Sequence, residues 1–221
     1  MTRGRGGFRP LAAALGLATA LLGAGSLAAQ FPVSLSGGAE ITTARLARTG
    51  ALERVWTGPV MGARGSATFR RFTLEGLYGQ GSLTPEAGTL GDGEDLVDGA
   101  LQLRFQVRPW ISVGGGPHLR AYVTPAGSSR WVRFEGRARA EGEIVNGIAF
   151  AHFEGWYAFG ASTNVQGGGS GAQGGEAGLT VLLPRTPFAL ALAYTADRAN
   201  FANGGSEFLE GVRFSVVFAG R

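Results

Sequence analysis

Cysteine and lysine are absent from this chain of 221 residues, and histidine occurs only twice. Without cysteine the protein can form neither disulfides nor thiolate metal sites, and it cannot be acylated as a lipoprotein. All 20 basic residues are therefore arginine, and they nearly balance the 16 acidic residues. No basic run is interleaved with aromatic residues, so we expect no nucleic-acid partner.

The first 29 residues have the three parts of an export signal. Three arginines give a positive start, an uncharged stretch rich in leucine and alanine follows, and small residues precede a cleavage point after Ala28 or Ala29. A retained membrane anchor is the alternative, but no cluster of charges stops the segment before strand-like sequence begins. We therefore expect residues 1–29 to be a signal peptide and residues 30–221 to form one domain.

Glycine and a two-residue periodicity dominate the rest of the chain. The 39 glycines are too many for a helical protein, and they suit tight turns and crowded strand walls. The periodicity is sharpest from Val132 to Glu143, where apolar or small residues alternate with arginine and glutamate. An amphipathic helix would repeat its apolar positions every three or four residues, so the pattern predicts strands and an all-β fold.

Breaks in this pattern predict ten strands. Short connections are expected at residues 70–71, 108–109, 145–147 and 184–187, and longer polar loops near residues 44–53, 84–94, 124–129, 162–175 and 196–206. Short turns on one side and long loops on the other are typical of outer-membrane barrels, whose short turns face the periplasm. We predict a closed up-and-down antiparallel transmembrane β-barrel. Eight or twelve strands are the alternatives, because Pro59 and several glycines weaken the first hairpin.

A soluble barrel or sandwich would also alternate, with its apolar face turned inward, so periodicity alone leaves that alternative open. Three observations favour lipid. Gly136, Ala138, Ala140 and Gly142 are poor fillers for a tightly packed soluble core. The polar face carries arginine and glutamate in near balance, as a confined salt-bridge network would. Aromatic residues such as Trp110 gather near the predicted strand ends, where the bilayer interfaces would lie.

The final strand alternates up to an aromatic residue close to the C-terminus, through Val212, Phe214, Val216 and Phe218. This run resembles the C-terminal assembly signal of bacterial outer-membrane proteins. Together with the export signal and the asymmetry of turns and loops, it makes the mature chain similar in architecture to the small monomeric outer-membrane β-barrel proteins. The resemblance implies an outer-membrane location and a monomer, with membrane lipid and the barrel-assembly machinery as partners.

Strand parity assigns most charged residues to the inner face of the barrel. Barrels of about eight strands are filled by side chains, whereas wide aqueous channels need about sixteen. We therefore predict a lumen filled by salt bridges, and a structural or surface-interaction role. A narrow small-solute pore and a soluble periplasmic binding protein are the alternatives. The residues assigned to this lumen network are Glu40, Arg64, Glu75, Asp98, Arg104, His118, Arg120, Arg133, Glu135, Arg137, Arg139, Glu141, Glu143, His152, Glu154, Glu176 and Arg213.

Two further motifs carry little weight. The run from Gly169 to Gly174 has the glycine spacing of a dinucleotide site, but a strand rather than a helix is expected after it. We interpret it as a loop and expect no cofactor. The acidic residues between Asp92 and Asp98 lack the spacing of a calcium loop, so we expect no metal site.

The two histidines are the remaining candidates for chemistry. His118 is expected near the loop end of its strand, and His152 near the turn end of a strand two places along, so they should not meet. A catalytic histidine needs an orienting acid and a nucleophile or activated water within hydrogen-bond reach. No segment combines these groups, and we predict that the protein is not an enzyme. Its short polar loops predict weak binding to any partner, such as lipopolysaccharide, another envelope protein or a host surface.

Overall fold

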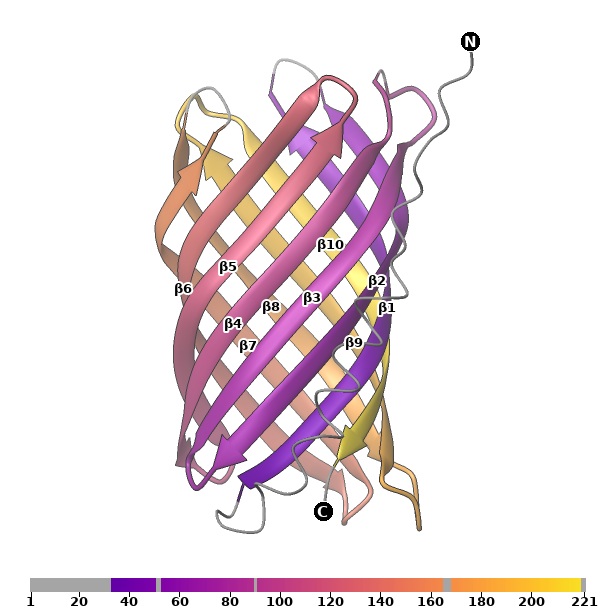
Figure 1. Ribbon diagram of the computed structural model, residues 1–221, viewed down its shortest axis with the longest axis vertical. Helices are drawn as coiled ribbons and strands as arrows, with labels where there is room; N and C mark the ends of the chain where they lie inside the picture. Colours follow the sequence, from indigo (N-terminus) through magenta and orange to yellow (C-terminus); the bar gives the residue numbers. More distant parts are fainter. Residues whose placement is uncertain (1–32, 51–52, 90, 165–167, 220–221) are drawn as a thin grey trace.

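A computed structural model describes residues 33–50, 53–89, 91–164 and 168–219, so the expected signal peptide and its cleavage point lie outside the described residues. Ten antiparallel strands close into one barrel (Figure 1), which confirms the predicted fold class and strand number. The strands are β1 (Val33–Thr49), β2 (Arg54–Phe69), β3 (Phe72–Pro85), β4 (Glu94–Arg108), β5 (Ile111–Thr124), β6 (Gly127–Val145), β7 (Ala149–Thr163), β8 (Gly169–Leu182), β9 (Phe188–Phe201) and β10 (Ser206–Ala219). Among these residues no helix is long and apolar enough to cross a membrane.

Every strand pairs with its neighbours in sequence, and β1 pairs with β10 to close the barrel. The first hairpin is intact in spite of Pro59, because β1 and β2 pair from Val33 opposite Phe69 to Arg48 opposite Arg54. We call the end of the barrel with the short connections at residues 70–71, 109–110, 146–148 and 183–187 the turn end, and the opposite end the loop end. The end of β10 lies at the turn end (Figure 1).

The loops are shorter than the sequence predicted. The strands β1 and β9 continue to Thr49 and Phe201, through stretches that were expected to be loops. The polar residues in these stretches made them look like loops. Two of them, Arg48 and Asp197, alternate with small or apolar residues along a strand and find partners inside the barrel. Arg48 on β1, for example, forms ion pairs with Glu94 and Glu207.

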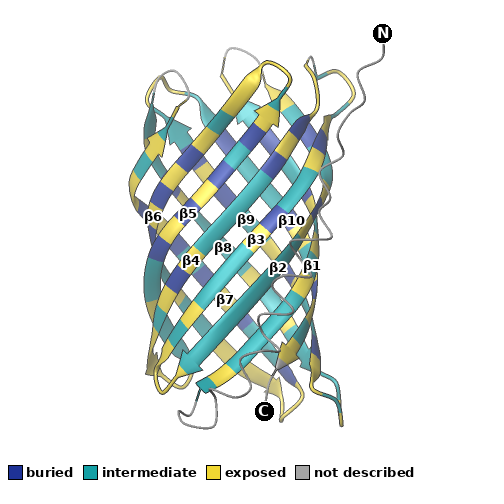
Figure 2. Cartoon of the chain, viewed as in Figure 1, coloured by how far each residue is buried: buried dark blue, intermediate teal, exposed yellow. Residues whose placement is uncertain are grey.

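The wall has an apolar outer face and an inner face of small and charged residues. On β9 the outward side chains of Phe188, Leu192 and Tyr194 are exposed, whereas the inward Ala189 and Ala193 are buried. This alternation of exposed and buried residues along a strand recurs around the barrel (Figure 2). It is the pattern expected when a two-residue period places lipid on one side of a strand and the lumen on the other.

Aromatic side chains gather on the outer face at the turn end. Phe72 and Phe105 lie with ring centroids 5.2 Å apart, and Phe188 and Phe218 with centroids 5.9 Å apart. Trp110, in the adjacent turn, is also exposed. Aromatic girdles at this level are typical of the interface between the hydrocarbon core and the headgroups. The other residues of the C-terminal alternation, Val212, Phe214 and Val216, point outward on β10 and are likewise exposed.

Candidate functional site

The barrel interior is the candidate site, because the inward side chains of all the strands meet there. It has three parts, which lie one after another along the barrel. We call them the loop-end layer, the lumen network and the turn-end cavity. The loop-end layer is a buried apolar cluster that includes Leu46, Trp56, Leu83, Leu96, Tyr122 and Trp131.

One arginine crosses the loop-end layer. The Arg48 guanidinium lies 4.4 Å from the ring centroid of Tyr122 and 5.3 Å from that of Trp56. It also forms ion pairs with Glu94 at 2.6 Å and Glu207 at 3.0 Å. The Tyr122 hydroxyl donates a hydrogen bond of 2.5 Å to Glu207. Most side chains in this part of the interior are nevertheless apolar, whereas strand parity predicted a polar lining. The prediction was wrong here because several of these inward residues lie in stretches that were expected to be loops.

The lumen network begins below this layer and centres on Glu135. Its carboxylate is fully buried and lies among three cationic or proton-donating groups. Arg133 is 2.9 Å away, Arg137 is 2.6 Å away, and Nδ1 of His118 is 2.7 Å away. A carboxylate so far from water is stabilised only by such close partners, since an unpaired buried charge costs several kcal/mol.

Two aspartates complete the upper part of the network. Asp98 is 2.9 Å from Nε2 of His118 and 3.0 Å from Nε of Arg120. Asp197 accepts hydrogen bonds from both terminal nitrogens of Arg133, at 2.6 and 3.0 Å. Asp197 is not among the predicted lumen residues, because residues 196–206 were expected to form a loop. The two-residue period that runs along β9 through its inward alanines would have placed Asp197 on the inner face.

The lower part of the network continues toward the turn end. Glu75 accepts from Arg64 at 3.4 Å and from Arg104 at 2.9 Å. Glu154 links Arg104, at 2.8 Å, to Arg137, at 2.8 Å. Through these shared carboxylates the ion pairs form one connected system rather than separate pairs.

A second branch lies on the other side of the lumen. The Glu176 carboxylate accepts a hydrogen bond from Nη2 of Arg213 at 2.5 Å and lies 2.9 Å from Nε2 of His152. Arg213 also lies 3.6 Å from Glu40, which pairs with Arg64. A side chain at Gly178 would collide with the His152 ring, so this glycine gives the imidazole its place across β8.

The structure places all but one of the expected lumen residues in ion pairs within this system. Arg139 pairs with Glu141 at 2.6 Å near the turn end, and lies 3.9 Å from Glu154. Glu143 is the exception, because it is exposed and accepts a hydrogen bond from the backbone N–H of Gly147 in the turn after β6.

One buried polar group in the network has no partner among the described residues. The Gln102 side chain is 4% exposed, and neither its amide nitrogen nor its oxygen makes a hydrogen bond there. It lines a cavity of about 40 Å³ together with Arg64, Arg104 and Arg137. A polar cavity of this size can hold water that satisfies such an amide.

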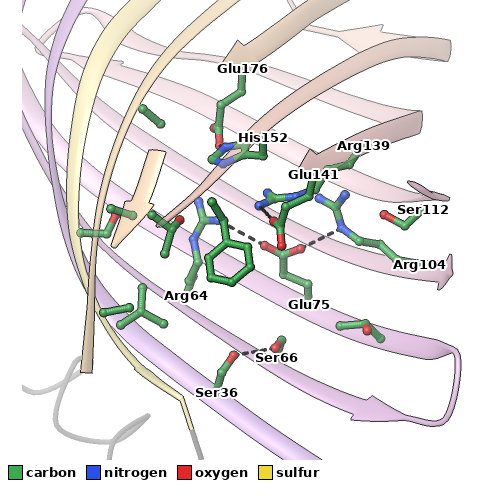
Figure 3. A pocket seen from close by; sticks show the side chains of 18 of the residues that line it. Ser36, Arg64, Ser66, Glu75, Arg104, Ser112, Arg139, Glu141, His152 and Glu176 are labelled. Atoms are coloured by element: carbon green, nitrogen blue, oxygen red, sulfur yellow. Dashed lines mark hydrogen bonds and ion pairs between the residues drawn. The ribbon is translucent and has the colours of Figure 1, made fainter. Parts of the chain in front are cut away.

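The turn-end cavity has a volume of about 610 Å³ (Figure 3). One wall is charged and carries Arg64, Glu75, Arg104, Arg139 and Glu141, which lie close together in Figure 3. Small or apolar side chains from β8, β9 and β10 form the opposite wall and include Leu182, Ala189, Ala191, Ala193 and Val217, although β8 and β10 also contribute Glu176 and Arg213 to the charged part of the lining. The cavity reaches the turn end, where 46% of the Glu141 side chain is exposed.

No protein-family model and no curated protein sequence matches this chain. Among solved structures, the outer membrane protease OmpT from Escherichia coli superimposes with a TM-score of 0.53 and 6% sequence identity, over 84% of this chain and 96% of that chain. This chain has the architecture of the small outer-membrane β-barrel proteins. The translocator domain of the autotransporter NalP from Neisseria meningitidis matches with a TM-score of 0.47 and 12% identity, over 94% of this chain and 96% of that chain. Neisserial surface protein A matches with a TM-score of 0.39 and 10% identity, over 84% of this chain and 97% of that chain.

The two histidines of this outer-membrane-type barrel lie in different parts of the network. His118 has a carboxylate at each ring nitrogen, and no hydroxyl bonds to it among the described residues. His152 has Glu176 at Nε2, while its Nδ1 is buried and has no hydrogen-bond partner among those residues. Within the same part of the chain, no group of three or more metal-ligating side chains comes together.

Proposed function

We propose that the protein is an integral outer-membrane β-barrel with a lumen closed to solutes, and that it has a structural or surface-interaction role. Its outer face supports the membrane location. Large apolar side chains such as Leu101, Leu103, Phe134, Leu192 and Phe214 are about half exposed on that face. Soluble monomers rarely expose contiguous apolar surface on this scale, whereas a lipid-facing barrel requires it. This observation also favours the membrane barrel over a soluble periplasmic binding protein.

The pairing of charges across the lumen carries the proposal of a closed barrel. Arg104, Arg137 and Glu154 join side chains from β4, β6 and β7, and Arg133 reaches Asp197 on β9. A passing ion would have to separate several of these buried pairs, and breaking each pair costs several kcal/mol. Above them, the mainly apolar loop-end layer adds a second barrier.

The histidine environments support a non-enzymatic role. A general base needs a free nitrogen lone pair that can reach a substrate or a water molecule. Each nitrogen of His118 lies against a carboxylate, so a substrate or a water molecule would have to displace that carboxylate to reach it. The buried Nδ1 of His152 does not reach solvent. The proposal therefore includes no catalytic residue.

Planar-bilayer recording tests the closed lumen. We expect the purified mature protein to show no steady conductance, although it co-fractionates with outer membranes and migrates in a heat-modifiable way on a gel. Arg139→Ala should be equally silent, because the pairs above it remain intact. Steady conductance that changes in Arg139→Ala would overturn the proposal and establish a narrow pore instead, a role that the turn-end cavity favours. Peptidase or esterase activity that is lost in His118→Ala would overturn the non-enzymatic role.

A further inference from the structure

We propose that the turn-end cavity is a binding site for a small molecule that carries an anionic, oxygen-rich group on an apolar body. The group would be a carboxylate, phosphate or sulfate. The site goes beyond the proposed closed barrel, since a closed lumen does not need a cavity of about 610 Å³ at one end. Pockets that bind small molecules commonly measure about 300–1,000 Å³.

The charged wall has more hydrogen-bond donors than the protein uses. Four arginines line the cavity, and each guanidinium has five N–H donors. Among the described residues, Nη2 of Arg64 and Nη1 of Arg104 have no acceptor. Nη1 of Arg213 likewise has none. A ligand that supplies oxygen acceptors would satisfy these donors.

Most of the carboxylate oxygens that line the cavity are already occupied. Both oxygens of Glu75 accept from arginines. Both oxygens of Glu176 are also engaged, one by His152 and one by Arg213. A cationic ligand would have to displace these partners, whereas an anionic ligand can use donors that are free. The excess of donors therefore favours an anion, even though arginine and glutamate are nearly balanced in number.

Arg139 is the entry point of the site. Its one close partner is Glu141 at 2.6 Å, and Glu154 is farther away at 3.9 Å. Because the Glu141 side chain is 46% exposed at the cavity mouth, it can swing into water at little cost when an incoming anion takes its place. The guanidinium presents two parallel N–H groups, which match a carboxylate or phosphate.

The opposite wall favours an apolar body on the ligand. Ala189, Ala191 and Ala193 occur at every second position of β9 and leave space where larger side chains would fill the lumen. Leu182 and Val217 extend this surface on the neighbouring strands. An inorganic anion would contact only the arginines, whereas an aryl or alkyl anion would also cover the apolar wall.

Titration calorimetry with phenyl phosphate tests the site on the mature protein in a maltoside detergent. We expect saturable binding that is at least about tenfold tighter than binding of inorganic phosphate or benzyl alcohol, since each lacks one half of the interaction. Arg139→Gln should weaken binding by about tenfold, the effect of losing one charge-assisted interaction. Ala191→Leu should weaken binding at least as much, because its added carbon atoms occupy space against the apolar wall that the phenyl ring would take. Arg198→Gln and Ala177→Leu change matched residues outside the cavity and should bind as the wild type does.

Heat-modifiable migration shows that each variant is folded, so loss of binding is not confused with loss of the barrel. The absence of saturable binding to wild type overturns the site, as does equal weakening by Arg139→Gln and Arg198→Gln. Mass spectrometry of an organic extract distinguishes the sources of the anion. A stoichiometric phospholipid that is lost in Ala191→Leu assigns the site to a lipid phosphate, and a clean extract with phenyl phosphate binding assigns it to a free molecule. Neither result depends on whether the lumen conducts.

Discussion

Replacement of Glu135 by glutamine tests whether the lumen network stabilises the fold. The carboxylate has three close partners, Arg133, Arg137 and His118, and no exposure to solvent. Glu135 has one hydrogen bond with His118 and two from Arg137, and at about 1.5–3 kcal/mol each they give a large upper limit, but the amide keeps one oxygen acceptor. Removing one member of a buried ion pair costs about 3–5 kcal/mol, because the remaining charges lose their compensation. We expect Glu135→Gln to lower the free energy of unfolding by that amount.

The assay is reversible urea unfolding of the refolded protein in lipid vesicles, followed by tryptophan fluorescence. Glu141→Gln is the matched control, since it makes the same chemical change on the same strand. Glu141 has a single arginine partner and a side chain that is 46% exposed, so its loss should cost at most about 1 kcal/mol. The contradicting result is an equal urea midpoint for the two variants, with the same dependence of the unfolding free energy on urea. That result would refute the argument that burial makes the charge of Glu135 important for stability.

Three further expectations concern other parts of the barrel. Tyr122→Phe removes the hydrogen bond to Glu207 in the loop-end layer and should cost about 1.5–3 kcal/mol in the same unfolding assay; an unchanged midpoint would show that this bond does not stabilise the layer. Gly178→Val places carbon atoms against an imidazole ring and should lower the folded fraction on a heat-modifiability gel, whereas Gly142→Val, which meets open space, should not. Leu101→Arg introduces a charge near the middle of β4 on the outer face and should cost about 2–4 kcal/mol in a bilayer; a loss near zero would contradict a lipid-facing position.

The strand pattern could be predicted because it depends on local chemistry. From Val132 to Glu143 a residue's parity decides whether it meets lipid or lumen, so the outward and inward faces could be assigned one residue at a time. Ten strands and the short turns followed from the same periodicity and its breaks. The turns at Arg70 and Arg185 adopt positive φ angles of 54° and 63°. Glycine, which adopts positive φ most easily, is absent from both positions, so the adjacent polar residues and the prolines beside Arg185 were what indicated turns here.

The loop-end layer and the partner of each charge could not be predicted from the sequence. Leu46 and Arg48 lie in a stretch whose polar residues look like a loop, yet it pairs with β2 and β10 as a strand, and Arg48 finds ion-pair partners on β4 and β10. Parity gives the face on which a side chain lies but says nothing of its height relative to strands elsewhere in the barrel. That Arg133 on β6 reaches Asp197 on β9 depends on the stagger of the closed sheet, which a single sequence does not encode locally.

The same stagger explains why the interior differs between its two ends. At the loop end, bulky side chains such as Trp56 and Trp131 belong to one buried apolar cluster that occupies the lumen. At the turn end, the inward positions of β9 are alanines, so the arginines that line the cavity face small side chains on that strand. Long arginines that face a wall of small residues leave unfilled space with unused donors, which is the physical origin of the turn-end cavity. A barrel that served only as a scaffold would gain stability if larger apolar side chains covered that wall, since removing apolar area from water is stabilising. Replacing the alanines of β9 by larger apolar side chains therefore distinguishes the two roles best. Such changes would stabilise a barrel that is only a scaffold, and they would inactivate a binding protein.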